Sequence, residues 1–510
     1  MTHGHVASAD SLAGSAGAAI LTAGGTAVDA ALATNAVMAV VAPHLCGIGG
    51  DLLALVHTSA GQVDCLLAAG RAGAGADAGV LRAEGRRSMP LYGDIRSVTV
   101  PGCVDGWVAL HERHATMALD DLLAPAVALA EDGFPASPLL VRACQGLDPA
   151  GRAQLSELAA QATGVGAVVR RPGLARTLRA IAGGGRDAFY LGEFGQGLLT
   201  LGAGWFAPDD LARGSASWVA PLKATAFGVD LWTAPPVSQG YLFLAGALLA
   251  DQLHLPDPDD PRWAHLLVEC AAAAGRDRPD VLFDGADGNA LVALASGRAG
   301  EIDPGRAGPR TRIAAAGDTT YLCAVDEHGT GVSLIQSNAS GFGSHLAEPA
   351  TAVNLHNRGL GFSLRPGHPA ELRPGARPPH TLVPALAVDR AGLRAVLGTM
   401  GGDAQPQVLL QLAARLFRHG QPVGEAVGAG RWALEGSVGF DTWTAGRVVL
   451  AVEGNAAPDW AAGLAALGHD VVTRPPYDSA FGHAHAIVRT PAGWSGAADP
   501  RTLVGSVAVA

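Results

Sequence analysis

Two adjacent threonines, Thr319 and Thr320, stand where a Gly/Arg/Pro-rich stretch gives way to a β-hairpin pattern. One interpretation is simple β-propensity, because threonine is common in strands. A second interpretation is that one of the two threonines is a catalytic nucleophile. A threonine at a new chain start carries a hydroxyl nucleophile and an α-amine, whose unperturbed pKa is about 7.7–8. Such an amine can take the proton of its own hydroxyl near neutral pH, so the enzyme needs no His or Asp partner.

Other catalytic signatures are missing, since the sequence contains no HExxH, GxSxG or P-loop motif. Residues 46–51, CGIGGD, lack the GxGxxG spacing of a dinucleotide loop, and we expect a close backbone approach in the core instead. His483 and His485 share one face if their segment is a strand. No third ligand lies within sequence reach, so we interpret both as packed or hydrogen-bonded side chains. The sequence predicts neither a metal nor a cofactor.

The elements that must position Thr319 are short helices and hairpins. Apolar periodicity predicts helices over residues 11–23 and 27–40, separated by two glycines that suit a helix C-cap, and more helices across 120–200. Apolar runs joined by turn residues predict strands at 52–57, 63–68, 321–325, 332–336, 385–388, 393–397 and 485–488. Strand pairs with helices before and between them indicate packed sheets covered by helices.

The stretch from residue 278 to residue 316 differs from the rest of the chain. It is rich in Gly, Arg, Asp and Pro, and its second half has little apolar periodicity. Within a compact protein such a stretch is usually a functional or mobile loop.

Composition limits the class of protein. The chain has 510 residues, of which 49% are hydrophobic and 16% charged, as is typical of a globular protein. The net charge is −11 without any Lys/Arg run, so no basic face is available for nucleic acid. The longest apolar stretch, residues 30–43, is too short to cross a bilayer, and the first residues do not form a secretory signal. We expect a cytoplasmic protein without nucleic-acid or membrane partners, and six buried, reduced cysteines.

Blocks along nearly the whole chain resemble the γ-glutamyltranspeptidase family. Each block alone is a weak signal, but their order along the chain is specific. They are residues 24–31 (GGTAVDAA), 43–51 (PHLCGIGGD), 97–102 (SVTVPG), 186–190 (RDAFY), 235–240 (PPVSQG), 317–320 (GDTT), 401–402 (GG) and 482–487 (GHAHAI).

The resemblance implies a fold and a maturation route. The fold is the four-layer αββα sandwich of N-terminal-nucleophile hydrolases. The threonine hydroxyl of the precursor attacks the preceding carbonyl, here that of Asp318, and an N-to-O acyl shift followed by hydrolysis frees Thr319. The implied products are a large subunit, residues 1–318, and a small subunit, residues 319–510, folded together as one domain. Residues 297–318 are then a tail that is mobile before cleavage.

Catalytic roles follow from the resemblance residue by residue. Thr319 is implied as the nucleophile and, through its amine, as the base. Ser337 stands where the family has a threonine whose hydroxyl orients the nucleophile. Gly401 and Gly402 match paired glycines whose backbone N–H groups form the oxyanion hole. Arg71 stands where the family holds the carboxylate of the donor.

Departures from the family pattern concern the acyl donor. Family members bind the α-ammonium group of the donor with an aspartate, and Gly361 occupies the matching position here, with Arg358 in place of a glutamine. The family's Ser-Ser pair becomes His380 and Thr381. A pocket that lost an acid and gained Arg and His should favour an anionic or neutral acyl donor. The substrate-binding residues that the resemblance implies are Arg71, Asn338, Arg358, His380 and Thr381.

These departures resemble the branch of the family that contains oxamate amidohydrolase and related acylases. We therefore expect a hydrolase that forms an acyl-Thr319 ester with a small carboxylated amide or an oxalyl-type donor, which water then hydrolyses. Glutathione hydrolysis or γ-glutamyl transfer, carbon–carbon bond hydrolysis in a biosynthetic pathway, and an unprocessed binding homologue remain alternatives. The expected partners are a small-molecule substrate and the two subunits of one precursor, and a dimer of processed heterodimers is left open.

Overall fold

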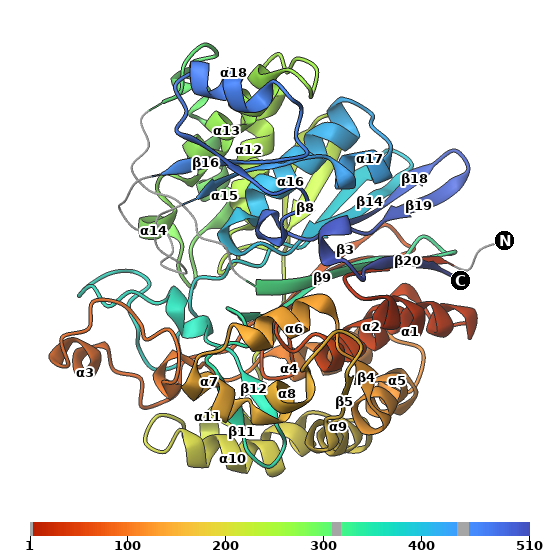
Figure 1. The fold of residues 1–510 in the computed structure, drawn as a ribbon, viewed down its shortest axis with the longest axis vertical. Helices are drawn as coiled ribbons and strands as arrows, with labels where there is room; N and C mark the ends of the chain where they lie inside the picture. Colours follow the sequence, from red (N-terminus) through yellow and green to blue (C-terminus); the bar gives the residue numbers. More distant parts are fainter. Residues whose placement is uncertain (1–3, 309–317, 436–447) are drawn as a thin grey trace.

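Two antiparallel sheets lie face to face at the centre of the computed structural model, which describes residues 4–308, 318–435 and 448–510 (Figure 1). One sheet has seven strands, in the spatial order β20 (Ser506–Val509), β1 (Gly4–Ser8), β9 (Asp318–Asp326), β10 (Gly331–Ala339), β2 (Asp51–His57), β3 (Val63–Ala68) and β6 (Ala216–Val219). The other has six strands, in the order β19 (Gly493–Ala497), β18 (Ala484–Thr490), β14 (Gly392–Thr399), β13 (Ala385–Asp389), β8 (Val229–Thr233) and β7 (Leu222–Ala226).

Helices cover the outer face of each sheet, so the layers run helix, sheet, sheet, helix, and the αββα expectation is confirmed. On the seven-stranded side lie α1 (Ser11–Thr22), α2 (Ala27–Val41), α4 (Cys103–His114), α5 (Leu119–Asp132) and α9 (Pro172–Tyr190). On the six-stranded side lie α12 (Gly240–Asp251), α13 (Pro261–Gly275), α15 (Gly288–Ser296), α16 (Gln405–Ala413), α17 (Val423–Gly428) and α18 (Trp460–Ala466). The shorter elements include α3 (Ala78–Ala83), α6 (Pro138–Gln145), α7 (Pro149–Gln154), α8 (Ser156–Gln161), α10 (Glu193–Leu201), α11 (Pro208–Ala212), α14 (Arg278–Val281), β4 (Phe134–Pro135), β5 (Val168–Val169), β11 (Leu346–Glu348), β12 (Val353–Leu355), β15 (Trp432–Glu435), β16 (Val449–Glu453) and β17 (Val471–Arg474).

The central strands are apolar on both faces, and this fixes their place in the sandwich. Along β9, Tyr321 and Cys323 face the six-stranded sheet, whereas Leu322 and Ala324 pack among α2 and its neighbours. A strand with this pattern is stable only between two layers, because an open face would expose apolar side chains to water.

Most predicted elements are confirmed. The helices expected over residues 11–23 and 27–40 are α1 and α2, and α2 starts at a capping box between Thr26 and Asp29. Every predicted strand is present, and β9, β10 and β14 extend further than the apolar runs indicated. All six cysteines are buried and free. No helix of the described ranges is long and apolar enough to span a membrane.

The loop expected over residues 278–316 is wrong in its first half. Residues 288–296 form α15, whose Leu291, Val292 and Ala295 are buried in the core of the six-stranded side. Residues 309–317 lie outside the described residues, so part of the expected tail, 297–318, is not described.

Segments from both sides of Thr319 are interleaved in both sheets. The seven-stranded sheet places β9 between β1 and β10, and the six-stranded sheet combines β7 and β8 with four later strands. The ends of the described chain are neighbours, because β20 pairs with β1 and the Ala510 N–H donates to the Gly4 carbonyl at 3.0 Å (Figure 1).

Candidate active site

Thr319 lies at the start of β9 beside a residue of the neighbouring strand. Its hydroxyl donates a hydrogen bond to the Ser337 hydroxyl, with Oγ1 and Oγ 3.0 Å apart, and both side chains are buried. The two residues are eighteen positions apart in the sequence, and the β9–β10 hairpin brings them together. Thr319 shares a strand face with Tyr321, so its side chain points toward the second sheet. We call these two groups the hydroxyl pair.

Asp51, at the start of β2, lies opposite Ser337 on the neighbouring strand, and no role was predicted for it from the sequence. Its buried carboxylate accepts hydrogen bonds from the backbone N–H groups of Gly70 and Gly102 at 2.9 and 3.1 Å. Its Oδ2 lies 3.2 Å from His380 Nε2 and 3.5 Å from His356 Nδ1. Burial alone would raise the pKa of Asp51, but the histidines and the backbone donors lower the pKa to about 2.

Asp51→Asn is expected to destabilise the fold by about 1–3 kcal/mol, because an amide has one acceptor oxygen in place of two and leaves buried donors unsatisfied. The folded-state pKa is depressed, so the stabilisation is present above the unfolded pKa of about 3.9 and is lost as pH falls through about 2. Urea denaturation at pH 7 and pH 3 measures both effects. Asp187→Asn is the control, since its carboxylate is 75% exposed and should change stability by less than about 0.5 kcal/mol. Equal stabilities of the two variants at pH 7 would contradict the role of Asp51.

Arg358 brings a cation to the hydroxyl pair. Its Nη2 lies 3.5 Å from Ser337 Oγ, and its Nη1 donates to Thr381 Oγ1 at 3.2 Å. Its Nε is buried and has no acceptor among the described residues. Burial lowers the pKa of Arg358 to about 10 against the opposing effect of Asp51 and Asp403, so the group stays charged at neutral pH. The site thus contains a buried cation with unused donor capacity.

His380 lies close to this cation but is not a second one. Burial and the charge of Arg358 lower the pKa of His380 to about 4, although its hydrogen bond to Asp51 opposes the shift. The ring is fully buried and neutral at pH 7. His380 therefore adds no positive charge to the pocket, and its ring belongs to the buried network around Asp51.

The side chains of Asn338 and Arg71 donate to backbone carbonyls outside the hydroxyl pair. Asn338 Nδ2 donates to the carbonyl of Pro43 at 3.3 Å, in the loop that precedes β2. Arg71 Nη1 donates to the carbonyl of Gly375 at 3.0 Å and lies 3.5 Å from Asp284, with about a quarter of its side chain exposed. Asn338 directly follows Ser337 along β10, and its buried Oδ1 has no hydrogen-bond partner among the described residues. Both residues therefore stay predictions as substrate-binding groups.

Gly401 and Gly402 form the turn between β14 and α16. Their φ angles are 139° and 53°, in the region that favours glycine. Gln239 Nε2 donates to the carbonyl of Gly402 at 3.1 Å and to that of Thr381 at 3.0 Å, which fastens the turn to the segment beside Arg358. Among the residues that the structure describes, no acceptor takes the backbone N–H of either glycine. Two preformed donors are therefore available at this turn.

Contacts between β14 and β9 place this turn near the start of β9. Tyr321, two residues after Thr319, lies so close to Gly398 that a Cβ on Gly398 would be 2.1 Å from its ring. Asp403, directly after the glycine pair, lies 3.0 Å from Arg278, and both side chains are buried. The turn is thus held on both sides.

Gly361 is packed against the chain. A Cβ at this position would lie 2.4 Å from the carbonyl oxygen of Pro379. No side chain fits there unless the backbone moves. The local packing therefore requires glycine at the position where the resemblance would place an aspartate.

Four residues without an assigned role complete the cluster: Asp51, Gln239, Arg278 and Asp403. The first two lie in the blocks 43–51 and 235–240, so the sequence did hold a signal for them. The other two belong to no motif that the sequence analysis identified.

The remaining motifs are structural. A Cβ on Gly49 or Gly50 would lie 2.2 or 2.4 Å from backbone oxygens of β12 and β10, which confirms the expected close approach. His483 and His485 are buried, each with one hydrogen-bonded ring nitrogen. Burial lowers the pKa of His483 to about 3 and that of His485 to about 4.

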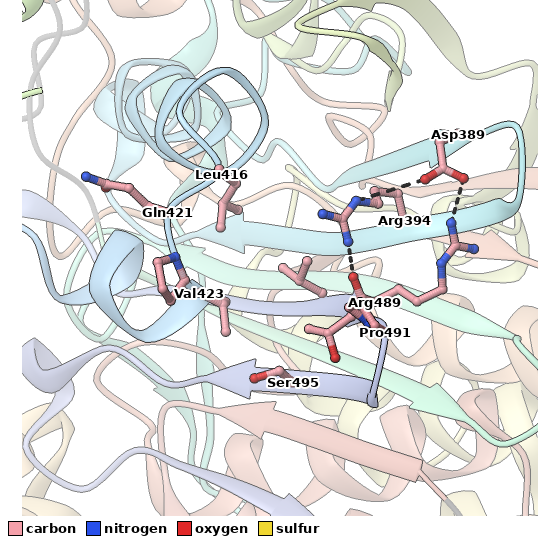
Figure 2. Close-up of a pocket in the computed structure, with 12 residues that line it drawn as sticks. Asp389, Arg394, Leu416, Gln421, Val423, Arg489, Pro491 and Ser495 are labelled. Atoms are coloured by element: carbon pink, nitrogen blue, oxygen red, sulfur yellow. Dashed lines mark hydrogen bonds and ion pairs between the residues drawn. The ribbon is translucent and has the colours of Figure 1, made fainter. Parts of the chain in front are cut away.

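A cavity of about 630 Å³ lies at the other end of β14, between the β13–β14 and β18–β19 turns (Figure 2). Its arginines are already engaged: Arg489 donates to Asp389 at 2.6 Å, and Arg394 donates to the carbonyl of Arg489. No residue of the hydroxyl pair or its surroundings lines this cavity.

The chain is similar to known proteins both in sequence and in structure. The family model for gamma-glutamyltranspeptidase matches residues 13–509. The chain is 37% identical to the oxamate amidohydrolase proenzyme of Klebsiella pneumoniae, over 98% of this chain and 97% of that protein. It is 32% identical to a glutathione hydrolase-like proenzyme of Bacillus subtilis, over 96% of this chain and 95% of that protein. The crystal structure of a cephalosporin acylase from Bacillus halodurans superposes with a TM-score of 0.89 at 32% identity, covering 99% of this chain and 96% of that one.

Proposed function

Because the chain belongs to the γ-glutamyltranspeptidase family of enzymes, we propose that it is a self-processing hydrolase whose nucleophile is Thr319. Cleavage after Asp318 yields a large chain, residues 1–318, and a small chain, residues 319–510. Relatives named as proenzymes support such a cleavage. The observation that carries the assignment is the hydroxyl pair with a buried cation beside it.

The proposed reaction starts with the α-amine that cleavage creates on Thr319. At an unperturbed pKa of about 7.7–8, this amine takes the hydroxyl proton as the oxygen attacks the donor carbonyl. The leaving amine receives that proton, and an acyl-Thr319 ester remains. Water then attacks the ester, which releases the acid and restores the hydroxyl. Ser337, at 3.0 Å, holds the hydroxyl in one orientation throughout.

The backbone N–H groups of Gly401 and Gly402 are the proposed oxyanion hole. They follow β14, point to no acceptor in the described chain, and are fixed by the hydrogen bonds of Gln239. Donors that are oriented before the reaction stabilise the developing negative charge without reorganisation.

Gly402→Val is expected to lower kcat by about 10²–10³-fold, because the side chain displaces the two donors, and to cost about 1–3 kcal/mol of stability, because valine is strained at a φ of 53°. Steady-state kinetics of the cleaved protein, together with urea denaturation, separate the two effects. Gly420→Val is the matched control, since Gly420 also has a positive φ, 64°, but faces open space. Gln239→Leu provides a second variant that loosens the turn without changing a glycine. Wild-type turnover in folded Gly402→Val would remove these glycines from the mechanism.

The proposed donor is a small carboxylated amide or an oxalyl-type compound. Arg358 supports this class, because a buried guanidinium with a free donor pairs well with a carboxylate or a dicarbonyl oxygen. The similarity to an oxamate amidohydrolase proenzyme agrees with it. Assaying the cleaved protein on oxamate, a γ-glutamyl-anilide and acyl-amino acids tests the class.

Glutathione hydrolysis is the second candidate, favoured by the similarity to a glutathione hydrolase-like proenzyme. The packing of Gly361 opposes it, because no carboxylate can occupy that position to bind an α-ammonium group.

A further inference from the structure

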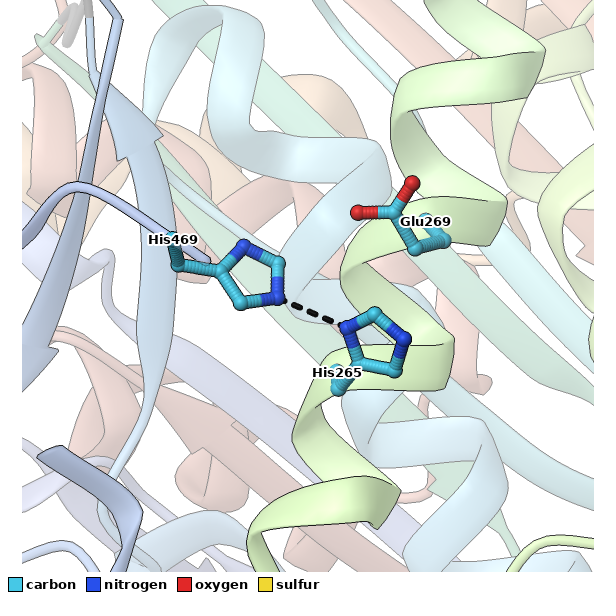
Figure 3. A group of neighbouring side chains, drawn as sticks. All are labelled: His265, Glu269 and His469. Atoms are coloured by element: carbon cyan, nitrogen blue, oxygen red, sulfur yellow. Dashed lines mark hydrogen bonds between the residues drawn. The ribbon is translucent and has the colours of Figure 1, made fainter. Parts of the chain in front are cut away.

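Two histidines and a glutamate meet in the helical layer on the six-stranded side (Figure 3). His265 and Glu269 lie one turn apart on α13, and His469 approaches them from the segment between α18 and β17. One ligand atom from each side chain lies within 4.8 Å of the others, and all three side chains are buried. Buried polar groups cost free energy unless strong partners compensate them.

We propose that His265, Glu269 and His469 bind one divalent transition-metal ion, with Zn²⁺ as the expected ion. Two imidazole nitrogens and one carboxylate oxygen are a ligand set that Zn²⁺ takes in proteins, and water fills the fourth position. The i, i+4 spacing on α13 puts two of the ligands on one helix face. Imidazole ligands also favour transition metals over Mg²⁺ and Ca²⁺.

A hydrogen bond already sets the His265 tautomer that a metal needs, and the proton of His469 Nε2 moves to Nδ1 of the same ring when Nε2 binds the ion. The His265 Nε2 lies 2.8 Å from the carbonyl oxygen of Asp303, which can only accept, so Nε2 carries the proton and Nδ1 presents a lone pair. That Nδ1 lies 2.7 Å from His469 Nε2. The Glu269 carboxylate is oriented by the backbone N–H of Gly308 at 3.1 Å. Metal-binding histidines commonly donate their second N–H to a carbonyl in this way, and the metal takes the place of the proton between the rings.

Metal binding requires a small separation of the two rings. Nitrogens bound to one tetrahedral Zn²⁺ are about 3.3 Å apart, so the present 2.7 Å opens by about 0.6 Å. Rotation of the His469 side chain, which lies outside regular secondary structure, provides this movement.

The cluster lies directly beneath a surface segment. Residues 303–308 cover it, and the Ala307 N–H donates to the carbonyl of Leu467 at 2.8 Å. Residues 303–306 are exposed, so within the described chain the cluster lies close to the surface.

The ligands come from both sides of Thr319. This part of the inference rests on the proposed cleavage: His265 and Glu269 then belong to the large chain and His469 to the small chain. A bound ion would link the two chains and hold residues 303–308, near the new carboxyl end, in place. Binding itself requires no cleavage.

The test measures Zn²⁺ binding by calorimetry, on full-length protein treated with chelator and then desalted. One ion per chain is expected, and Co²⁺ should give the strong visible absorption of a tetrahedral site. Glu269→Gln and His469→Ala should each weaken binding at least about 100-fold. His254→Ala, at an exposed position, should leave it unchanged. Thermal denaturation without metal first establishes that each variant is folded.

Absence of stoichiometric binding by folded wild-type protein, or equal binding by folded Glu269→Gln, would overturn the site. Uncleaved Thr319→Ala should bind Zn²⁺ like wild type, so the site is tested independently of the proposed function. In cleaved protein, chelator should lower the melting temperature and Zn²⁺ should restore it. An unchanged melting temperature there would overturn the link between the chains.

Discussion

Purified wild-type protein is expected to run as two fragments on a denaturing gel, the smaller one beginning Thr-Thr-Tyr-Leu, whereas Thr319→Ala stays a single chain. Cleavage needs the Thr319 hydroxyl to attack the carbonyl before it, and turnover needs the same oxygen together with the amine that cleavage frees. Removing the hydroxyl should therefore abolish both, with a loss of kcat on the order of 10⁴-fold or more. N-terminal sequencing of the small fragment and kinetics on the same preparation measure the two effects.

Thr320→Ala is the matched control for this experiment. Thr320 is the same residue type one position further along β9, buried to the same degree, but on the other face of the strand. It should leave cleavage intact, and Thr319→Ser should cleave because it keeps the hydroxyl. A wild-type chain that stays whole and is fully active would show that Thr319 is not the nucleophile.

The second large effect concerns the acyl donor. Cleaved protein should hydrolyse carboxylated or oxalyl-type amides at least about 100-fold more efficiently, by kcat/KM, than a γ-glutamyl-anilide. An α-ammonium group that enters the site meets the charge of Arg358 and finds no acid at Gly361. Leaving a buried charge unpaired costs about 3–5 kcal/mol, which corresponds to this difference.

Two variants locate the origin of this preference. Arg358→Gln should lower kcat/KM for anionic donors about 100-fold and affect a neutral acyl amide much less. Arg365→Gln, at an arginine whose side chain is 62% exposed, is the control and should change neither. Gly361→Asp should not create γ-glutamyl activity, because its Cβ would meet the Pro379 carbonyl at 2.4 Å. Efficient γ-glutamyl turnover by wild type would show that another acid serves the donor.

Local patterns predicted the helices and strands well because they depend on residues that are close in the sequence. The capping box at Thr26 and the apolar runs of β2 and β3 are readable in this way. The Thr319–Ser337 contact was also accessible, since a hairpin joins the two positions. The loop expectation failed over α15 because its short apolar run stands in a stretch that is otherwise rich in Gly, Arg, Asp and Pro. The helix gains its stability from tertiary packing, which a local pattern does not show.

The rest of the candidate site depends on contacts between distant segments. Asp51 and His380 are more than three hundred residues apart in the sequence, and the role of each depends on its contact with the other. The neutral state of His380 follows from its burial, which a sequence pattern does not show. The hydrogen bond from Asn338 to the Pro43 carbonyl likewise appears only when the loop before β2 is placed beside β10.

The pairing of β20 with β1 makes the chain suitable for circular permutation. Gly4 and Ala510 are joined by a hydrogen bond, so a short linker could connect them without disturbing either strand. New ends opened before Thr319 would separate only Asp318 from β9 and would leave the other strands of both sheets uncut. The permuted protein would carry the threonine α-amine from the time of its synthesis, once the initiator methionine is removed. Its maturation would no longer depend on its own nucleophile, so the chemistry of peptide-bond cleavage and the chemistry of turnover could be studied separately in one fold.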